Sequence, residues 1–439
     1  MAADGHLVSL EQAVNLLSGG TPPKSVPQYW GGTIPWASAK DMTGPRLRDT
    51  EDHITEAGLE SRCRLAPIGA TLVLVRGMTL LTDIPICTLY KDMAFNQDIK
   101  ALLPKQALDG KYLTYTLLCR KKELLNMVEL AGHGTGRLPT DRLKSLQIKL
   151  PPIHEQLAIV HILGTLDDKI ELNRQMNKTL EGIARTMFKS WFVDFDPVRA
   201  KADGRDPGLP KEIADLFPNS FRDSELGQIP EKWGVTRLGE ITDVIDCLQS
   251  KKPERRPSGK PLLQLWNVRD DGLMDTSDTY FIDESDYRMW VSRMEASPGD
   301  CVVTNVGRVG AVAQVPRGLN AALGRNMTGI RCKKEFPFPT FLIECLLSEA
   351  MRSEIILKTD TGTILDALNV RSIPELRIVK PSVEISRVFE GLSRPLRARM
   401  ERNLVDCGTL ASLRDTLLPK LISGELRIPD AETVAGRHA

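Results

Sequence analysis

The chain has 439 residues, 41% of them hydrophobic, and its 58 lysines and arginines almost balance 57 aspartates and glutamates, which leaves a net charge of +1. No run approaches the roughly 18 consecutive apolar residues of a membrane span, and the eight cysteines form neither a CxxC pair nor a regular framework. Residues 1–20 also lack the order of a secretory signal, so we expect a cytoplasmic protein without a membrane segment.

The sequence repeats itself after 230 residues. A gap-free shift by this distance aligns glycines, prolines and tryptophans in the two halves, and it also aligns two asparagine pairs. The matches include Trp36/Trp266, Gly77/Gly307, Asn96/Asn326 and Pro151/Pro381. A repeat of this length predicts two copies of one structural unit, related by a pseudo-twofold axis.

The larger part of each repeat, residues 1–150 and 233–380, predicts a mixed α/β lobe. Turn signals such as Gly19-Gly20 separate short apolar runs such as 70–75, as expected for several short strands. We expect one amphipathic helix in each lobe, over residues 111–128 and 339–357.

A heptad pattern follows each lobe, over residues 154–192 and 384–422. Apolar residues recur with 4,3 spacing, and Asn173 and Asn403 stand near the two midpoints. The pattern predicts two long helices that form an antiparallel coiled coil with Asn173 facing Asn403. A core stripe on ordinary bundle helices is the alternative, which the length and repetition of the pattern disfavour.

These signals divide the chain into six segments. They are a first lobe (1–150), a first long helix (151–195), a connector (196–232), a second lobe (233–380), a second long helix (381–428) and a C-terminal tail (429–439). The connector is rich in proline and charge, which predicts an extended conformation. The predicted fold class is therefore α/β with mixed α+β lobes, in which two tandem lobes are joined by an antiparallel coiled coil.

Motifs for catalysis are missing from the sequence. There is no GxxxxGK[ST] phosphate loop, and Leu150-Pro151-Pro152-Ile153 lacks the polar head and the ring of an adenine-methylating tetrapeptide. His154 and His161 form only a weak candidate metal pair. We therefore expect no catalytic, cofactor or metal site on this chain. Basic segments such as 251–260 could contact phosphates, although a solvated charged face is an equal alternative.

The segment Leu150-Pro151-Pro152-Ile153-His154-Glu155-Gln156, which opens the first long helix, resembles a family pattern. It is similar to the Pro-Pro-x-x-Glu-Gln sequence of type I restriction-modification specificity subunits. The resemblance extends over the whole chain and includes residues 190–195, 224–233 and 417–426. The second helix departs from the pattern, because residues 380–386 keep one proline and lose the Glu-Gln pair.

The resemblance implies a non-catalytic subunit with a split double-stranded DNA target. Each lobe would read one half, the coil would set the unread gap, and two methyltransferase subunits would flank the coil. S-adenosylmethionine would bind those partners, and ATP and Mg would serve restriction or translocase subunits that could join. Two alternatives remain open: a repeat-built protein-binding scaffold, which the modest net charge favours slightly, and an orphan or anti-restriction subunit.

Candidate DNA-reading residues follow from residue type, because Arg and Lys suit guanine, Asn and Gln suit adenine, and hydroxyls suit several positions. A structural or solvent-facing role is the alternative for each candidate, and residues that differ between the lobes are favoured. The candidates are Trp36, Ser38, Lys40, Arg76, Asn96, Gln97, Thr135 and Arg137 in the first lobe, and Asn267, Arg269, Asn305, Arg308, Arg325, Asn326 and Thr363 in the second.

Overall fold

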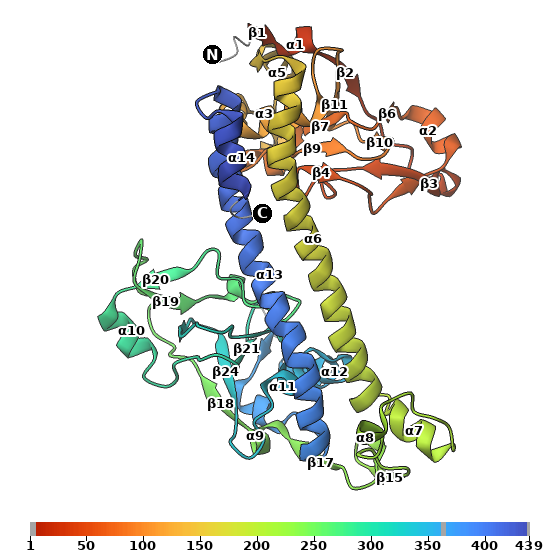
Figure 1. The fold of residues 1–439 in the computed structure, drawn as a ribbon, viewed down its shortest axis with the longest axis vertical. Coiled ribbons are helices and arrows are strands. Elements are labelled where there is room, and N and C mark those ends of the chain that lie inside the picture. The colour runs from red at the N-terminus through yellow and green to blue at the C-terminus, as the bar shows by residue number, and fades with distance from the viewer. Residues whose placement is uncertain (1–5, 361–365, 437–439) are drawn as a thin grey trace. The chain divides into compact units, whose positions relative to one another are not determined.

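A computed structural model of the chain describes residues 6–360 and 366–436. The chain divides into two compact units: unit 1 comprises residues 1–170 and 409–439, and unit 2 comprises residues 171–408. Each unit contains one lobe and part of each of two long helices (Figure 1). Among the described residues, no helix is long and apolar enough to cross a membrane.

The lobe of unit 1 is built on two main β-sheets. Its strands are β1 (His6–Ser9), β2 (Val14–Ser18), β3 (Trp30–Ala37), β4 (Arg46–Leu47), β5 (His53–Ile54), β6 (Leu65–Ala66), β7 (Thr71–Leu74), β8 (Arg76–Gly77), β9 (Ile86–Leu89), β10 (Met93–Phe95), β11 (Ile99–Pro104), β12 (Glu129–Leu130), β13 (Gly136–Arg137) and β14 (Gln147–Leu150). The main sheets have the orders β2-β11-β7-β9-β4 and β5-β3-β10-β6, and a small sheet has the order β12-β13-β8. Antiparallel pairing of β1 with β14 joins the two ends of the lobe.

The helices of this lobe are short. They are α1 (Leu10–Ala13), α2 (Glu56–Arg62), α3 (Gly110–Cys119), α4 (Lys121–Asn126) and α5 (Thr140–Ser145), with 3-10 turns η1 (Pro27–Tyr29), η2 (Met78–Leu81) and η3 (Gly132–Gly134). The prediction of one amphipathic helix over 111–128 was wrong. The chain breaks at Arg120 into α3 and α4, and α3 is buried at every position from 112 to 117. It packs on β9 on one side, and Tyr115 bonds to the long helix on another, so it has no broad solvent face.

The lobe of unit 2 uses a similar strand arrangement. Its strands are β17 (Gly234–Arg237), β18 (Thr242–Asp246), β19 (Lys260–Leu263), β20 (Tyr280–Ile282), β21 (Cys301–Thr304), β22 (Val312–Gln314), β23 (Ala322–Leu323), β24 (Met327–Cys332), β25 (Thr359–Asp360), β26 (Ala367–Leu368) and β27 (Arg377–Lys380). The main sheet has the order β18-β24-β21-β22, and the second sheet has the order β20-β19-β23. Pairing of β17 with β27 joins the ends of this lobe, as β1 and β14 do in unit 1.

The helices of this lobe are α9 (Leu238–Ile241), α10 (Glu284–Trp290), α11 (Pro339–Leu347) and α12 (Glu349–Leu357), with 3-10 turns η4 (Leu265–Asn267) and η5 (Val370–Glu375). The single helix expected over 339–357 is again two helices. The break comes at Ser348, whose side chain accepts a hydrogen bond from the Met351 N–H and so caps α12.

The prediction of an extended connector was wrong. Residues 196–232 contain α7 (Asp196–Ala202), α8 (Lys211–Ala214) and the hairpin of β15 (Phe221–Ser224) and β16 (Gly227–Pro230). The apolar residues Val198, Phe217 and Ile229 are at most 2% exposed and belong to the core of unit 2. These side chains fold the segment despite its prolines, because their burial compensates for the lost chain entropy.

The two predicted long helices are confirmed: α6 spans Ile153–Phe192 and α13 spans Val383–Ser423, and α14 (Ile428–Gly436) follows. In unit 1, Arg414 Nη1 of α13 lies 2.8 Å from Asp167 Oδ1 of α6. In unit 2, Asn403 Nδ2 of α13 donates to Asn177 Oδ1 of α6 at 2.7 Å. Within unit 2, residues 177 and 192 of α6 meet residues 403 and 389 of α13, so the pairing is antiparallel, as predicted.

The predicted register of the coil was wrong by one helical turn. Asn403 is fully buried and bonds to Asn177, whereas Asn173 lies beside Cys407. An apolar repeat alone cannot distinguish registers that differ by one turn, because each shift again places apolar residues opposite one another. The buried side-chain N–H of Asn403 needs an acceptor, and Asn177 Oδ1 supplies it.

The end of α6 forms part of the core of unit 2. The Phe192 ring lies 5.1 Å from the Phe389 ring of α13 and 5.1 Å from the Phe341 ring of α11, both edge to face. Trp191 packs against Phe389 in the same way at 6.1 Å. Aromatic pairs of this geometry each add roughly 0.5–1.5 kcal/mol beyond their buried area. The lobe of unit 2 is therefore fixed to both long helices by one aromatic cluster.

Candidate nucleic-acid interface

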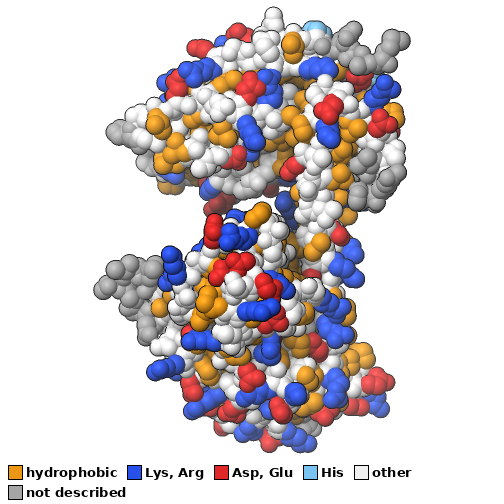
Figure 2. Space-filling model, turned by 90° about the vertical axis from the view of Figure 1, so that its left-hand side faces the viewer, with side chains coloured by type: hydrophobic (Ala, Val, Ile, Leu, Met, Phe, Trp, Pro, Cys, Tyr) orange, Lys and Arg blue, Asp and Glu red, His pale blue; other side chains and the backbone are white. Residues whose placement is uncertain are grey.

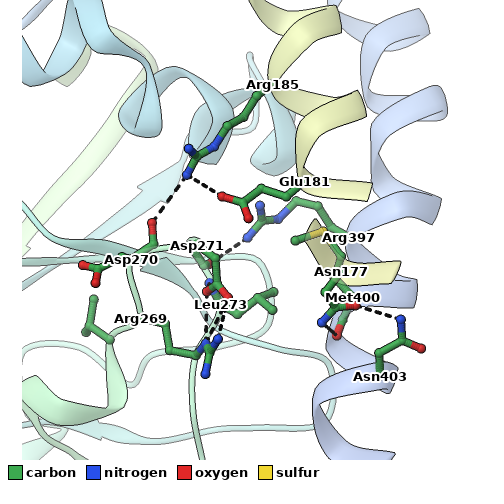
Figure 3. Close-up of polar contacts among 12 residues, drawn as sticks. Asn177, Glu181, Arg185, Arg269, Asp270, Asp271, Leu273, Arg397, Met400 and Asn403 are labelled. Atoms are coloured by element: carbon green, nitrogen blue, oxygen red, sulfur yellow. Dashed lines mark hydrogen bonds and ion pairs between the residues drawn. The ribbon is translucent and has the colours of Figure 1, made fainter. Parts of the chain in front are cut away.

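A buried ion pair also holds the lobe of unit 2 against helix α13. Arg397 Nη1 lies 3.1 Å from Glu344 Oε1 of α11, and the two side chains are 3% and 2% exposed. Arg397 Nη2 also donates to the backbone oxygen of Gly272 at 2.7 Å, in the loop shown in Figure 3. Glu390 accepts a hydrogen bond from the N–H of Thr340, in the first turn of α11, at 2.8 Å. Burial raises the pKa of both glutamates.

The corresponding contact in unit 1 has the opposite charge on the long helix. Asp167 of α6 is 5% exposed and accepts hydrogen bonds from Tyr115 Oη at 2.6 Å and Arg414 Nη1 at 2.8 Å. Position 167 corresponds to Arg397 after the 230-residue shift. Both lobes are therefore attached to the coil at the same place, by contacts of different chemistry.

Three candidate readout residues are buried and serve the fold. Trp36, Asn267 and Asn305 are 5%, 1% and 5% exposed. Each donates its side-chain N–H to a backbone carbonyl, at 3.0 Å for Trp36, 2.6 Å for Asn267 and 3.1 Å for Asn305. Their positions argue against contact with DNA.

Four other candidates are held by acidic side chains. The pairs are Ser38 with Asp41, Lys40 with Asp52, Arg269 with Asp271 and Arg308 with Asp270. The hydrogen bond to Asp52 raises the pKa of Lys40, and the hydrogen bond to Asp271 raises that of Arg269. To contact DNA, each of these groups would have to give up its acidic partner in the protein. This loss reduces the net binding free energy that the contact contributes.

In unit 1, the structure places Arg76 and Arg137 opposite each other on neighbouring strands, and Gln97 stands in the turn before β11. Next to Gln97, the Val75 N–H donates to the Asp98 oxygen at 2.8 Å, and Gln97 Oε1 accepts a hydrogen bond from the Thr21 hydroxyl at 2.6 Å. Arg76 lies opposite Arg137 where β8 pairs with β13. Directly opposite residues in such a ladder point to the same face, with Cβ atoms about 4.5–5.5 Å apart. All three side chains are exposed. We call this set the unit 1 row.

Unit 2 has an equivalent row, formed by Arg325, Val306 and Ala367. The Asn305 N–H donates to the Asn326 oxygen at 2.8 Å, and Arg325 stands beside Asn326 in the turn before β24. Val306 pairs with Ala367 in an antiparallel bridge. The same backbone positions thus carry Gln, Arg and Arg in one lobe and Arg, Val and Ala in the other. We call this second set the unit 2 row.

Three further candidates, Asn96, Asn326 and Thr135, stand at turns. Asn96 Oδ1 accepts a hydrogen bond from the Asp98 N–H at 3.1 Å, and Asn326 has a left-handed backbone with φ of 62°. Thr135 is half-buried after the 3-10 turn η3. Thr363 lies outside the described residues.

The gap-free alignment of the two sequence halves at a shift of 230 residues was wrong over the middle of the lobes. Pairing of β10 with β3 places Ala37 beside Phe95, and the equivalent pairing of β23 with β19 places Leu263 beside Leu323. Trp36 therefore corresponds to Leu262, not to Trp266. Surface loops between the strands differ in length between the two copies, which shifts the alignment without changing the sheets.

Sequence reasoning selected four of the six row residues and missed Val306 and Ala367. A signal for them existed, because the 230-residue shift aligns them with Arg76 and Arg137. They were overlooked because only polar side chains were considered as readers of DNA, whereas apolar side chains can contact the thymine methyl group.

On the face drawn in Figure 2, lysines and arginines are interspersed with aspartates and glutamates. This distribution agrees with the net charge of +1. On this face, attraction to phosphates therefore depends on individual cations that lack acidic partners. Arg76, Arg137 and Arg325 are exposed and have no ion-pair partner within residues 6–360 and 366–436.

Comparisons with known proteins agree with this architecture. Residues 6–182 match the type I restriction modification DNA specificity domain. The chain is 28% identical to the type I restriction enzyme MjaIX specificity subunit of Methanocaldococcus jannaschii, over 97% of this chain and 94% of that one. It is 26% identical to the HindI specificity subunit of Haemophilus influenzae, over 69% of this chain and 74% of that one. The crystal structure of a type I system S subunit from M. genitalium has the same fold, with a TM-score of 0.59, 15% identity and coverage of 95% and 96%.

The chain has two tandem mixed α+β lobes, each followed by a long helix, and the two long helices pack antiparallel. Together with the match to a DNA specificity domain, this architecture defines a DNA-recognition protein of the two-lobed class. The domain match and the similarity over nearly the whole length of a curated relative support a specificity subunit of a type I restriction-modification system. Its role is recognition of the DNA target, and it is a non-catalytic subunit.

Proposed function

We propose that the chain reads a bipartite double-stranded DNA target, with one lobe on each half-site. The observation that carries this proposal is the pair of equivalent rows. The two lobes share strand pairings at these positions and differ in the side chains they present. Two copies of one fold with unlike polar groups suit two unlike half-sites, because base edges are distinguished by the pattern of donors and acceptors.

The coil then acts as the spacer between the half-sites. Helix α6 has 40 residues and α13 has 41. At 1.5 Å per residue, each is about 60 Å long. Antiparallel pairing makes the two helices a stiffer strut than either helix alone. The length of this strut sets the number of base pairs that neither lobe reads.

Two methyltransferase subunits supply the catalysis and bind along the coil. Exposed leucines on the long helices support this part of the proposal: Leu157 and Leu172 of α6 are 51% and 58% exposed, and Leu392 of α13 is 44% exposed. Apolar side chains at helical surfaces suit a partner's helices. S-adenosylmethionine binds to the methyltransferase, and ATP and Mg serve restriction or translocase subunits when these join. The complex works in the cytoplasm.

Coexpression with the cognate methyltransferase tests this function. We expect mapping of methylated adenines to show one motif made of two specified half-sites and an unspecified gap. The methyltransferase expressed alone is the control and should leave that motif unmethylated. A continuous motif, or no methylation that depends on this chain, would contradict the proposal and favour a scaffold role.

A further inference from the structure

We infer that the two rows are the elements that read bases, and that they assign different base classes to the two half-sites. In unit 1, Arg76 and Arg137 contact guanine, and Gln97 contacts adenine by exchanging its bond with the Thr21 hydroxyl for bonds to the base. In unit 2, Arg325 contacts guanine, while Val306 and Ala367 contact an apolar base edge such as the thymine methyl group. This inference rests on the proposed function and identifies the residues that execute it.

The arginine pair of the unit 1 row points to an external partner. Like charges that lie directly opposite each other on paired strands destabilise a sheet. Arg76 and Arg137 are such a pair, and within the described parts of the chain neither guanidinium has a hydrogen-bond or ion-pair partner. In contrast, Lys121, in the same lobe, lies 2.7 Å from an Asp83 oxygen. A bound DNA would supply the acceptors that the row lacks.

The surroundings of the unit 1 row also fit a contact surface. Met78 follows the row directly and is 61% exposed, and Leu130, beside Gly136 in the ladder, is 76% exposed. Gly77, between Arg76 and Met78, has φ of +150°, a conformation that favours glycine. The glycine turns the chain away after Arg76, so the guanidinium stands at the end of the strand. Large exposed apolar side chains beside unpaired cations are typical of binding sites.

A paired β-ribbon of this kind can enter the major groove, which is wide enough for two strands. There, an arginine can bond to both O6 and N7 of guanine, and a glutamine can bond to both N6 and N7 of adenine. The unit 2 row carries one arginine, Arg325, and two small apolar side chains, Val306 and Ala367. The half-site read by unit 2 should therefore depend on fewer hydrogen bonds to bases than the half-site read by unit 1.

The experiment compares Arg76→Lys, Arg76→Ala and Arg137→Lys with the unchanged chain, each coexpressed with the cognate methyltransferase. Lysine keeps the charge but loses the two-pronged geometry of arginine. We expect Arg76→Lys to relax one position of one half-site, with a roughly 5- to 150-fold loss of discrimination there, and to leave the other half-site unchanged. Arg64→Lys is the matched control, because Arg64 is an exposed arginine of the same lobe that belongs to neither row.

A second variant tests the equivalence of the rows. Val306→Arg places an arginine in the unit 2 row, at the position of Arg76 in the other lobe. It should change the base requirement of the other half-site only. Thermal melting within a few degrees of the unchanged chain verifies that each variant is folded, which the exposure of Arg76 and Arg137 and the partial exposure of Val306 favour.

Contact with phosphates in place of bases would overturn the inference. In that case Arg76→Lys would keep the motif, and Arg76→Ala would weaken binding to all sequences equally and reduce the salt slope by about 1. An unchanged motif with full methylation in every variant would also overturn it. Failure of the proposed function is distinguishable, because the unchanged chain would then direct no bipartite methylation at all.

Discussion

Removal of Arg397 should strongly destabilise unit 2. Its guanidinium lies 3.1 Å from Glu344, with both side chains at most 3% exposed, so Arg397→Met leaves a buried carboxylate without its ionic partner. Loss of one member of a buried pair costs about 3–5 kcal/mol. For a domain of the size of residues 171–408, about 1 kcal/mol changes the melting temperature by roughly 2–4 °C, so we expect a decrease of about 6–20 °C.

The pH dependence gives this prediction a second readout. Burial already raises the pKa of Glu344, and Arg397 opposes that shift. Without the arginine, the folded state favours the neutral carboxyl more strongly than the unfolded state does. Stability is then lost as pH rises through the raised pKa, so the variant should recover part of its stability between pH 7 and pH 5.

Matched variants complete the test. Arg402→Met changes an exposed arginine of the same helix and should leave the melting temperature nearly unchanged. The double variant Arg397→Met with Glu344→Leu should regain most of the loss, because two apolar side chains replace both charges. Scanning calorimetry or urea unfolding of the full chain measures all three. If Arg397→Met melts together with the Arg402→Met control, the buried pair does not anchor the lobe.

Three further predictions concern the coil and the lobes. Asn177→Leu alone should lower the free energy of unfolding by about 1–3 kcal/mol, because buried Asn403 loses its acceptor. Leucine at both positions should match or exceed the original stability in chemical unfolding. Equal effects of the single and double changes would contradict the pairing. Insertion of one heptad after Gln175 and another after Val405 lengthens the coiled coil by about 10 Å. The gap between the half-sites should then grow by ~3 base pairs at ~3.4 Å each. An unchanged gap in the methylation map would exclude the coil as the spacer. Replacement of residues 1–150 by the lobe of a relative should change one half of the methylated motif, and a change in both halves would show that the lobes form one composite site.

The sequence alone predicted the repeated architecture because the signals are local. Heptad spacing depends on residues three and four apart, so the long helices were located to within a residue or two at each end. Glycine turns around short apolar runs similarly indicated mixed lobes. The opening Pro151-Pro152 and Glu155-Gln156 carried the family resemblance, which the comparisons confirm.

Only the tertiary structure decided which distant residues meet. The register of Asn403 against Asn177 depends on a buried amide that needs a partner, and an apolar repeat does not encode that choice. The connector became ordered because Phe217 and Ile229 reach the core of unit 2, which its proline content did not reveal. Arg76 and Arg137 come from separate segments of the sequence, and only the pairing of β8 with β13 brings these side chains onto one face.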